Sequence, residues 1–372
     1  MRLVNLPRRL LLRKIFVAAT LAVPVLSMQI AAAEIPIDWS RVQRVSSKSD
    51  LARYIEKERL AGQSVIPVIL ANGLTVTGQD FITLCPASVV SWKTVANDGQ
   101  NVSMIYTLMD YPGTKVANAY LRGDTTWLNA EEKRLYDAAV AIVNEAKTRN
   151  GMINQEVYIY EWIMNNSTYL SGDMDHQPHF VTAYGVLVEH RANCQGYADA
   201  FYMLGRMMGW NVGRMSGTAG GGGHAWNWIE INGKKYFVDA TWDDQSIKNG
   251  DVKYNGYVYF NAPVEIMQDT HSWDWSLAPQ NLQPSVDDCY SYCFLGSHLA
   301  RATNVDAGLK IIAQKFKERN GWFSVMVPFD AKYSDNNVMK SAMQKVCDEC
   351  GKNIDWRWWK RGKYMFIHVR TN

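Results

Sequence analysis

The chain has 372 residues, of which 47% are hydrophobic and 12% aromatic, so it can bury a sizeable core and form more than one domain. It carries 39 basic and 36 acidic residues, and the first 33 residues supply five of the basic and none of the acidic ones, which leaves a net charge of −2 on the rest. That balance gives no support for a nucleic-acid partner.

Residues 1–33 have the pattern of a secretory signal peptide. A basic start precedes a long apolar stretch, and three alanines end it before Glu34. We therefore expect a protein that is secreted or located in the periplasm or cell envelope. The alternative is an uncleaved membrane anchor, although Pro24 and Gln29 weaken such a span. Contact with a membrane is expected through this segment only.

Residues 34–125 are expected to form a small α+β module. A helical pattern over Ser49–Leu60 leads through Ala61-Gly62 into a strand at Val65–Leu70. A second helix and two strand-like runs follow, near Asp80–Val90, Trp92–Ala96 and Val102–Leu108.

Residues 126–280 are expected to form the central domain. Asn129–Thr148 has an apolar stripe at helical spacing, and a second helix is predicted around Gln155–Asn165. A short strand is expected at Tyr257–Asn261.

Cys194 is the candidate nucleophile of this central domain. Apolar side chains recur after it at helical spacing until Gly209, so the sequence places Cys194 at a helix N-terminus. Unpaired N–H groups and the helix dipole favour a thiolate there. A lone cysteine in an apolar helix can equally be a small buried hydrophobe.

His224 and Asp239 are predicted to lie on a hairpin. The segments His224–Ile231 and Lys235–Trp242 have strand character, and Asn232-Gly233 between them is a strong two-residue turn signal. This turn pairs Ile231 with Lys234 and sets Trp226 opposite Asp239. His224 and Asp239 then project from one face as diagonal neighbours, close enough for an imidazole–carboxylate hydrogen bond.

Residues 281–372 repeat the order of elements predicted for the first module. The corresponding segments are Thr303–Glu318, Trp322–Val327, Asn336–Asp348, Ile354–Trp359 and Tyr364–Val369. The shared order of helix, strand, helix, strand, strand predicts two similar α+β modules that flank the central domain.

Residues 183–244 resemble the transglutaminase-like cysteine-protease superfamily, in its bacterial and kyphoscoliosis-peptidase branches. The matching pieces are Tyr184-Gly185, Cys194-Gln195-Gly196-Tyr197-Ala198, His224-Ala225-Trp226-Asn227 and Val238-Asp239-Ala240-Thr241-Trp242-Asp243. The resemblance implies an α+β fold with a papain-like core, in which a helix carrying the nucleophile packs on an antiparallel sheet. It also implies Cys194 as nucleophile, His224 as base and acid, and Asp239 as the group that orients the imidazole.

Several further residues are weaker candidates for contact with substrate. They are Tyr184, Gln195, Gly223, Trp226 and Trp242. Core packing explains most of the tryptophans equally well, and the Gly220–Gly223 run is either a closely approached edge of the cleft or a plain flexible connection. An oxyanion hole would use the N–H of Cys194. The candidates for a second donor are Tyr169, Tyr184 and Trp162.

The other cysteines do not form a convincing metal or redox motif. They are Cys85, Cys289, Cys293, Cys347 and Cys350. Buried thiols or one structural disulfide fit them better than a zinc site or a Cys-x-x-Cys redox pair. We therefore expect neither a metal nor a cofactor. No calcium-loop pattern is present in the sequence.

Two classes of function are compatible with these residues. The first is an exported cysteine enzyme that attacks an amide in a peptide or protein, such as a cell-wall peptide, and passes the acyl-thioester to water or to an amine. Hydrolysis is favoured, because water is abundant unless a site excludes it. Transfer to an amine would make the protein a glutamine γ-glutamyltransferase. The second class is a non-catalytic envelope-binding module. The sequence does not fix the oligomeric state.

Overall fold

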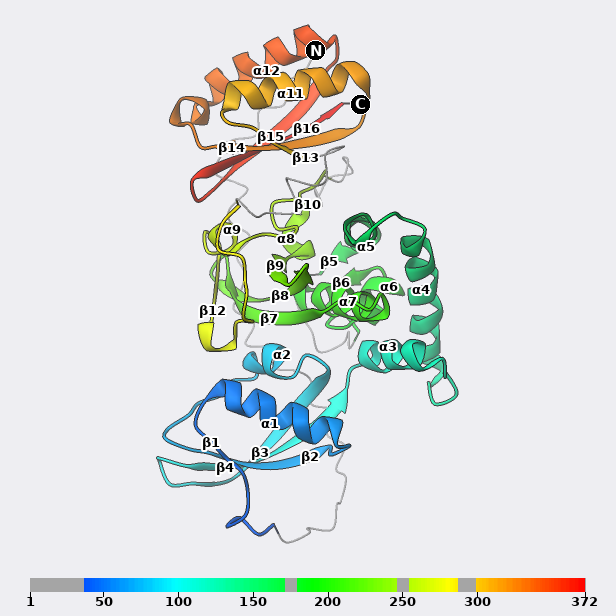
Figure 1. The fold of residues 1–372 in the computed structure, drawn as a ribbon, viewed down its shortest axis with the longest axis vertical. Coiled ribbons are helices and arrows are strands. Elements are labelled where there is room, and N and C mark those ends of the chain that lie inside the picture. The colour runs from blue at the N-terminus through cyan, green and yellow to red at the C-terminus, as the bar shows by residue number, and fades with distance from the viewer. Residues whose placement is uncertain (1–36, 171–178, 246–253, 287–298, 372) are drawn as a thin grey trace.

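The computed structural model describes residues 37–170, 179–245, 254–286 and 299–371. Three α+β units follow one another along the longest axis of the molecule (Figure 1). The predicted signal peptide lies outside the described residues. In the described ranges, no helix combines the length and the apolar character needed to cross a bilayer.

The N-terminal unit is a four-stranded sheet covered by two helices. Its elements are β1 (Arg44–Val45), α1 (Lys48–Leu60), β2 (Val65–Leu70), α2 (Asp80–Leu84), β3 (Ser88–Asn97) and β4 (Val102–Asp110). The strand order is β1-β2-β4-β3, with β1 parallel to β2 and the other pairs antiparallel. The helix predicted near Asp80–Val90 is much shorter than expected, because Ser88 already belongs to β3.

The central unit contains the helices and the sheet that hold the candidate site. Its helical elements are α3 (Pro112–Arg122), α4 (Ala130–Lys147), α5 (Met152–Asn166), α6 (Ala183–Leu187), α7 (Cys194–Met207), α8 (Ala240–Asp243), α9 (Val264–Met267) and the 3₁₀ helix η1 (Trp275–Leu277). Its strands are β5 (Thr168–Tyr169), β6 (Arg191–Ala192), β7 (Val212–Ala219), β8 (Gly222–Ile231), β9 (Lys234–Val238), β10 (Asp244–Gln245), β11 (Tyr254–Asn255) and β12 (His271–Trp273). The main sheet is antiparallel in the order β12-β7-β8-β9.

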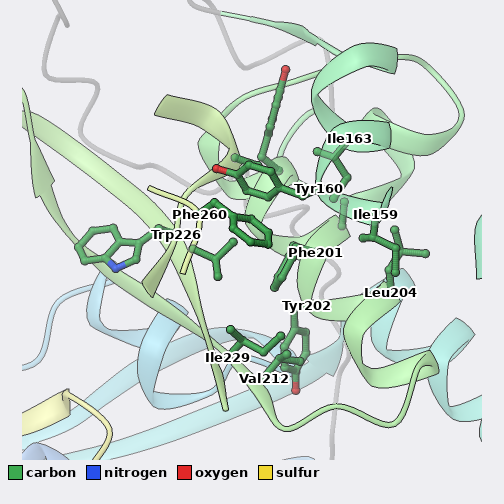
Figure 2. Close-up of a cluster of buried hydrophobic side chains, with 14 of the residues drawn as sticks. Ile159, Tyr160, Ile163, Phe201, Tyr202, Leu204, Val212, Trp226, Ile229 and Phe260 are labelled. Carbon is green, nitrogen blue, oxygen red and sulfur yellow. The ribbon is translucent and has the colours of Figure 1, made fainter. Parts of the chain in front are cut away.

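Helix α7 packs against β7 and β8 and forms the centre of the largest apolar core. Phe201 and Leu204 of α7 meet side chains of α5 on one side and of the sheet on the other, as Figure 2 shows for Ile159, Tyr160 and Ile229. Each large side chain buried in this way stabilises the fold by about 1.5–3 kcal/mol. The nucleophile helix therefore has a rigid surrounding.

The C-terminal unit repeats the strand order of the N-terminal one. Its elements are β13 (Leu299–Arg301), α11 (Val305–Glu318), β14 (Trp322–Pro328), η3 (Ala331–Ser334), α12 (Asn336–Cys350), β15 (Ile354–Arg361) and β16 (Tyr364–Thr371). The order β13-β14-β16-β15 again has one parallel pair followed by two antiparallel pairs. The predicted repetition of helix, strand, helix, strand, strand is present in both units.

The two flanking units contact the central unit through opposite faces. In the N-terminal unit, α1 and α2 lie between the sheet and the central unit (Figure 1). In the C-terminal unit the sheet faces the centre, and Met326, Tyr364 and Phe366 join the central core. Helices α11 and α12 lie on the far side of that sheet (Figure 1).

Candidate active site

Cys194 is the first residue of α7, as the sequence predicted. Asn193 caps the helix, and its side-chain oxygen accepts hydrogen bonds from the N–H groups of Gln195 and Gly196 at 2.9 and 3.3 Å. The following turn needs a glycine, because a Cβ on Gly196 would lie 2.6 Å from the carbonyl oxygen of Phe180. The sulfur is buried, with 8% of the residue exposed.

His224 lies on β8, and the predicted hairpin register is present. Ile231 pairs with Lys234, and the ladder runs as far as Asn227 opposite Val238. Asn232 and Gly233 both have positive φ, at 52° and 77°, as a two-residue hairpin turn requires. The predicted pairing of Trp226 with Asp239 is not made, because the ladder ends one residue earlier.

Asp239 begins a helix instead of continuing the strand. One carboxylate oxygen, Oδ1, accepts hydrogen bonds from the N–H groups of Thr241 and Trp242 at 2.9 and 3.1 Å, which caps α8. The prediction of a strand through Trp242 was therefore wrong. The cap still leaves the second oxygen, Oδ2, directed at His224, whose Nε2 lies 2.7 Å away.

The imidazole of His224 lies beside the carboxylate of Asp239 and is influenced by the charge of Cys194. Its Nε2 faces Asp239, which leaves Nδ1 for the Cys194 side chain. Burial lowers the pKa of His224, but the negative charges of Asp239 and Cys194 outweigh burial and raise it to about 10. Burial raises the pKa of Asp239, whereas the charge and hydrogen bond of His224 hold it well below its usual range. Both effects favour a protonated imidazole beside an ionised carboxylate.

A second histidine, which is not among the residues predicted for the site, contacts the same carboxylate. His271 lies on β12, and its Nε2 is 3.0 Å from Oδ2 of Asp239. It is 32 residues from Asp239 in sequence, so no local pattern could have identified it. The one available signal was its position in the aromatic run that includes Trp273 and Trp275.

The residues predicted more weakly to contact substrate lie in different surroundings from one another. Tyr184 lies away from the sulfur, and its hydroxyl accepts a hydrogen bond from Arg134 at 3.0 Å. Gln195 is buried, and its N–H is bound by the cap of α7. Trp226 is 1% exposed and stacks on His224 at a centroid distance of 5.8 Å, so it is a wall behind the imidazole. Trp242 is half-buried, 6.1 Å from the His224 ring.

Gly223 is exposed beside His224 and adjoins the N-terminal unit. A Cβ at this position would meet the side chain of Gln79 at 3.4 Å, so the glycine lies close to another unit of the same chain. Its predicted contact with substrate stays a prediction.

Among the three candidates for a second oxyanion donor, Tyr169 is the one near the sulfur. It packs against the small apolar cluster that contains Cys194. Burial and the negative charges of Cys194 and Asp239 raise the pKa of the Tyr169 hydroxyl, which keeps it protonated and able to donate. Trp162 lies near the ring of His190 instead.

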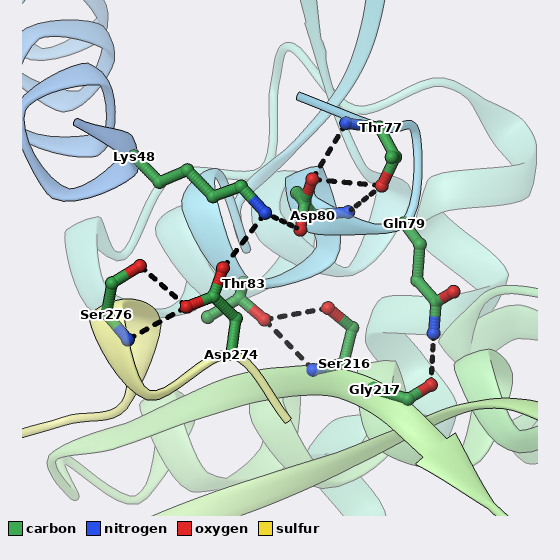
Figure 3. Close-up of polar contacts among 9 residues, drawn as sticks. All are labelled: Lys48, Thr77, Gln79, Asp80, Thr83, Ser216, Gly217, Asp274 and Ser276. Atoms are coloured by element: carbon green, nitrogen blue, oxygen red, sulfur yellow. Dashed lines mark hydrogen bonds and ion pairs between the residues drawn. The ribbon is translucent and has the colours of Figure 1, made fainter. Parts of the chain in front are cut away.

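The N-terminal unit reaches the site through α2. Ile82 belongs to the cluster with Cys194 and Ala225. Gln79 donates a hydrogen bond to the carbonyl of Gly217 on β7, and Thr83 bonds Ser216 at 2.9 Å (Figure 3). Next to Gln79 in the sequence, Asp80 forms an ion pair with Lys48 at 2.9 Å, and Lys48 also pairs with Asp274 of the central unit at 2.9 Å (Figure 3). Residues outside the central unit therefore contribute to the surroundings of Cys194 and of β7.

The remaining cysteines of the described ranges are free thiols. Cys85 is buried in the N-terminal core, and burial raises its pKa to about 11. Cys347 and Cys350 lie on α12 and are half-buried. Cys289 and Cys293 lie outside the described residues.

His224, Asp239 and His271 could also be considered as metal ligands, because their ligand atoms lie within 4.8 Å of one another. The distances of 2.7 and 3.0 Å from Oδ2 to the two imidazoles are those of hydrogen bonds. Asp239 Oδ2 can accept hydrogen bonds from Nε2 of both His224 and His271, and these two bonds explain why the three side chains lie together.

Comparison with known proteins agrees with this geometry. Residues 137–240 match the model of the transglutaminase-like superfamily. Kyphoscoliosis peptidase of Mus musculus is 24% identical over 218 residues, which cover 48% of this chain and 32% of that protein. The protein of the same name from Homo sapiens is 24% identical over 155 residues, which cover 36% of this chain and 23% of the relative. The chain thus spans about a third or less of the length of these relatives.

A solved structure of a TGase gives a TM-score of 0.27 at 14% identity, over 52% of this chain and 53% of that one. A TM-score of that size does not establish that the two proteins share a fold. The family match covers Cys194, His224 and Asp239 together, and residues 137–240 of this chain are thus similar to the transglutaminase-like superfamily.

Proposed function

We propose that the protein is an exported cysteine enzyme that hydrolyses amide bonds in a peptide or protein substrate. The observation that carries the proposal is the buried His224, which is bound to Asp239 with 2.7 Å between Nε2 and Oδ2 and whose pKa is raised by Asp239 and by Cys194 at the start of α7. A thiol nucleophile, a base and a group that orients the base are the three parts that acyl transfer needs.

The reaction begins with attack of the Cys194 thiolate on the amide carbonyl carbon. The oxygen takes the negative charge and is stabilised by the N–H of Cys194 and the hydroxyl of Tyr169. The C–N bond then breaks, and the leaving amine takes the proton from Nδ1 of His224. An acyl-thioester on Cys194 and a neutral imidazole remain.

Water completes the cycle. His224 Nδ1 removes a proton from a water molecule, and the resulting hydroxide attacks the thioester. Collapse of the tetrahedral intermediate breaks the C–S bond, releases the carboxylic acid and restores the thiolate–imidazolium pair. Asp239 keeps Nε2 protonated and the ring oriented through both steps. The name of the curated relatives, kyphoscoliosis peptidase, also favours cleavage.

The test compares the two acceptors directly. Wild-type protein is incubated with an envelope peptide extract in H₂¹⁸O that contains a fluorescent primary amine, and the products are analysed by mass spectrometry. We expect ¹⁸O in new carboxyl groups. Transfer of the amine to glutamine would instead identify a cross-linking enzyme, and no turnover with normal envelope binding would identify a binding module.

Matched variants assign the chemistry to the site. Cys194→Ala is expected to abolish turnover, and Asp239→Asn to lower it by about 10²–10⁴-fold, the range for loss of the orienting carboxylate. Cys85→Ala is the control, because it removes a buried thiol that is held protonated. Export is tested separately, by sequencing the N-terminus of the mature protein after fractionation of the cells.

A further inference from the structure

His271 is a second imidazole that contacts the catalytic carboxylate. It is 4% exposed and lies on the edge strand β12, which pairs with β7. Its Nε2 is 3.0 Å from Oδ2 of Asp239, the same oxygen that is 2.7 Å from Nε2 of His224. Oδ1 is already bound by two backbone N–H groups of α8. The carboxylate therefore has four donors around it.

A chain of hydrogen bonds leads away from the other nitrogen of His271. Nδ1 lies 2.8 Å from the Thr270 hydroxyl, which lies 2.9 Å from the Tyr259 hydroxyl. That hydroxyl accepts a hydrogen bond from Nε of Arg361 at 2.6 Å. A guanidinium only donates.

The direction of every proton in this chain then follows. The ionised carboxylate of Asp239 only accepts, so Nε2 of His271 carries the ring proton and Nδ1 of the neutral ring accepts from Thr270. The Thr270 oxygen then accepts from Tyr259, whose oxygen accepts from Arg361. The chain runs in one direction from the C-terminal unit to the catalytic carboxylate.

The charged surroundings keep His271 neutral, as this chain requires. Burial lowers its pKa, and the positive charges of His224 and Arg361 lower it further, against the opposing effect of Asp239. Three aromatic side chains restrict its ring, one of them Trp226 with 5.2 Å between centroids. Trp242 lies 4.8 Å away between centroids and Tyr259 5.2 Å away.

We propose that His271 is a positioning residue that locks the Asp239 carboxylate toward His224, and that Arg361 on β15 supports its tautomer through Tyr259 and Thr270. The inference rests on the proposed cysteine chemistry of Cys194. It assigns the C-terminal unit a part in the site, although Arg361 touches neither the sulfur nor the imidazole of His224. Without the second donor, the carboxylate could turn toward its cap on α8, and the His224 imidazolium would lose its partner.

The experiment measures the rate of Cys194 alkylation by iodoacetamide as a function of pH, with the modified residue identified by mass spectrometry. A thiolate–imidazolium pair reacts well below the pH at which a free thiol ionises, about 8.5. We expect His271→Leu to lower the rate at pH 6 about tenfold or more and to move the profile toward that of a free thiol. His271→Gln, whose side-chain N–H₂ can replace the Nε2 donor, is expected to restore most of the rate.

Tyr259→Phe tests the distant part of the chain. It removes one hydroxyl and keeps the ring, so we expect a loss in the same direction but smaller, about two- to tenfold. Tyr257→Phe is the matched control, because the Tyr257 hydroxyl bonds Glu161 instead, and its profile is expected to match the wild type. If His271→Leu does not fold, as judged by circular dichroism, the comparison of Tyr259→Phe with Tyr257→Phe decides the matter.

The possible results separate this inference from the proposed function. A wild-type profile for His271→Leu or Tyr259→Phe, together with loss of reactivity in His224→Gln, would leave the enzyme intact and overturn the role of His271. If wild-type Cys194 itself reacts as a free thiol and is indifferent to His224→Gln, the cysteine chemistry fails, and the inference fails with it.

Discussion

Ile82 of the N-terminal unit lies in the same buried cluster as Cys194. The nucleophile of the central unit is therefore partly covered by α2, a helix that ends at Leu84, before that unit begins at Pro112. With this helix in place, 8% of Cys194 is exposed. A small reagent or an extended peptide could reach the sulfur more easily than a bulky folded protein.

Truncation of Ile82 is expected to open the approach to the sulfur. In the wild type we expect a bulky maleimide to label Cys194 at least about tenfold more slowly than iodoacetamide, and in Ile82→Ala we expect this ratio to shrink. Removal of a buried isoleucine also costs about 2–5 kcal/mol of stability. Ile66→Ala is the control, since Ile66 is equally buried in the same unit but belongs to another cluster. An unchanged ratio in Ile82→Ala would show that α2 does not limit access.

Tyr169 is expected to contribute to turnover and not to substrate binding. Tyr169→Phe removes the hydroxyl, so the negative oxygen of the tetrahedral intermediate loses a donor, and kcat should fall by about 10²-fold with little change in KM. Steady-state kinetics with the peptide substrate identified for the wild type provides the measurement. The matched control is Tyr184→Phe, because the Tyr184 hydroxyl bonds Arg134 away from the sulfur. Equal kcat values for both variants would remove Tyr169 from the oxyanion site.

The stability contributed by His224 should depend on pH in one direction. Burial lowers its pKa, but Asp239 and Cys194 raise it to about 10 in the folded chain, against about 6.5 in the unfolded chain. The protonated imidazole thus stabilises the fold fully below about pH 6.5, and this contribution is lost as the pH rises toward 10.

Urea unfolding of the wild type and of His224→Gln between pH 6 and pH 10 tests this. We expect the difference in free energy of unfolding to decrease across that window by at least about 1.4 kcal/mol, the equivalent of one pKa unit. A difference that stays constant with pH would mean that His224 has an ordinary pKa.

Glu156 on α5 should destabilise the fold at neutral and higher pH. It is fully buried, Asn261 donates to one of its oxygens at 2.9 Å, and the other oxygen has no partner in the described part of the chain. Burial raises its pKa to about 8. The protonated form is compatible with the core, so the penalty grows as the pH rises from about 4.5 to 8.

Glu156→Gln is therefore expected to be more stable than the wild type at pH 8, by about 3 kcal/mol, and nearly equal to it at pH 4.5. Denaturant titrations at the two pH values measure the change. Glu145→Gln, an exposed position on the preceding helix α4, should show no such trend. Equal stability of Glu156→Gln and wild type at both pH values would contradict the raised pKa.

The local parts of the site could be predicted because short-range rules determine them. Asn232-Gly233 fixed the turn and therefore the register of His224, and the apolar spacing after Cys194 predicted α7. The family resemblance was confirmed by the match over residues 137–240. The end of β9 was predicted wrongly, because Asp239 satisfies the N–H groups of Thr241 and Trp242 and so begins a helix there.

The parts that depend on tertiary packing could not be predicted. The segment Tyr257–Asn261 was expected to be a strand, but it is irregular apart from a bridge at the next residue, Ala262, to Phe237. Its backbone N–H groups at Val258 and Tyr259 bind the carboxylate of Asp243 instead. His271 and Ile82 reach the site from distant segments of the chain, and nothing in their local sequence indicates such contacts.

The opposite docking of the two flanking units means that they are not interchangeable parts, despite their common topology. If the C-terminal unit were grafted at the N-terminal position in the orientation used there, Met326, Tyr364 and Phe366 would be turned to water. Exposed lysines on its helices, such as Lys310 and Lys345, would be pressed against the central unit. The two units thus share a topology but differ in which of their surfaces is apolar. A protein in which the two units were exchanged would not form the same interfaces with the central unit.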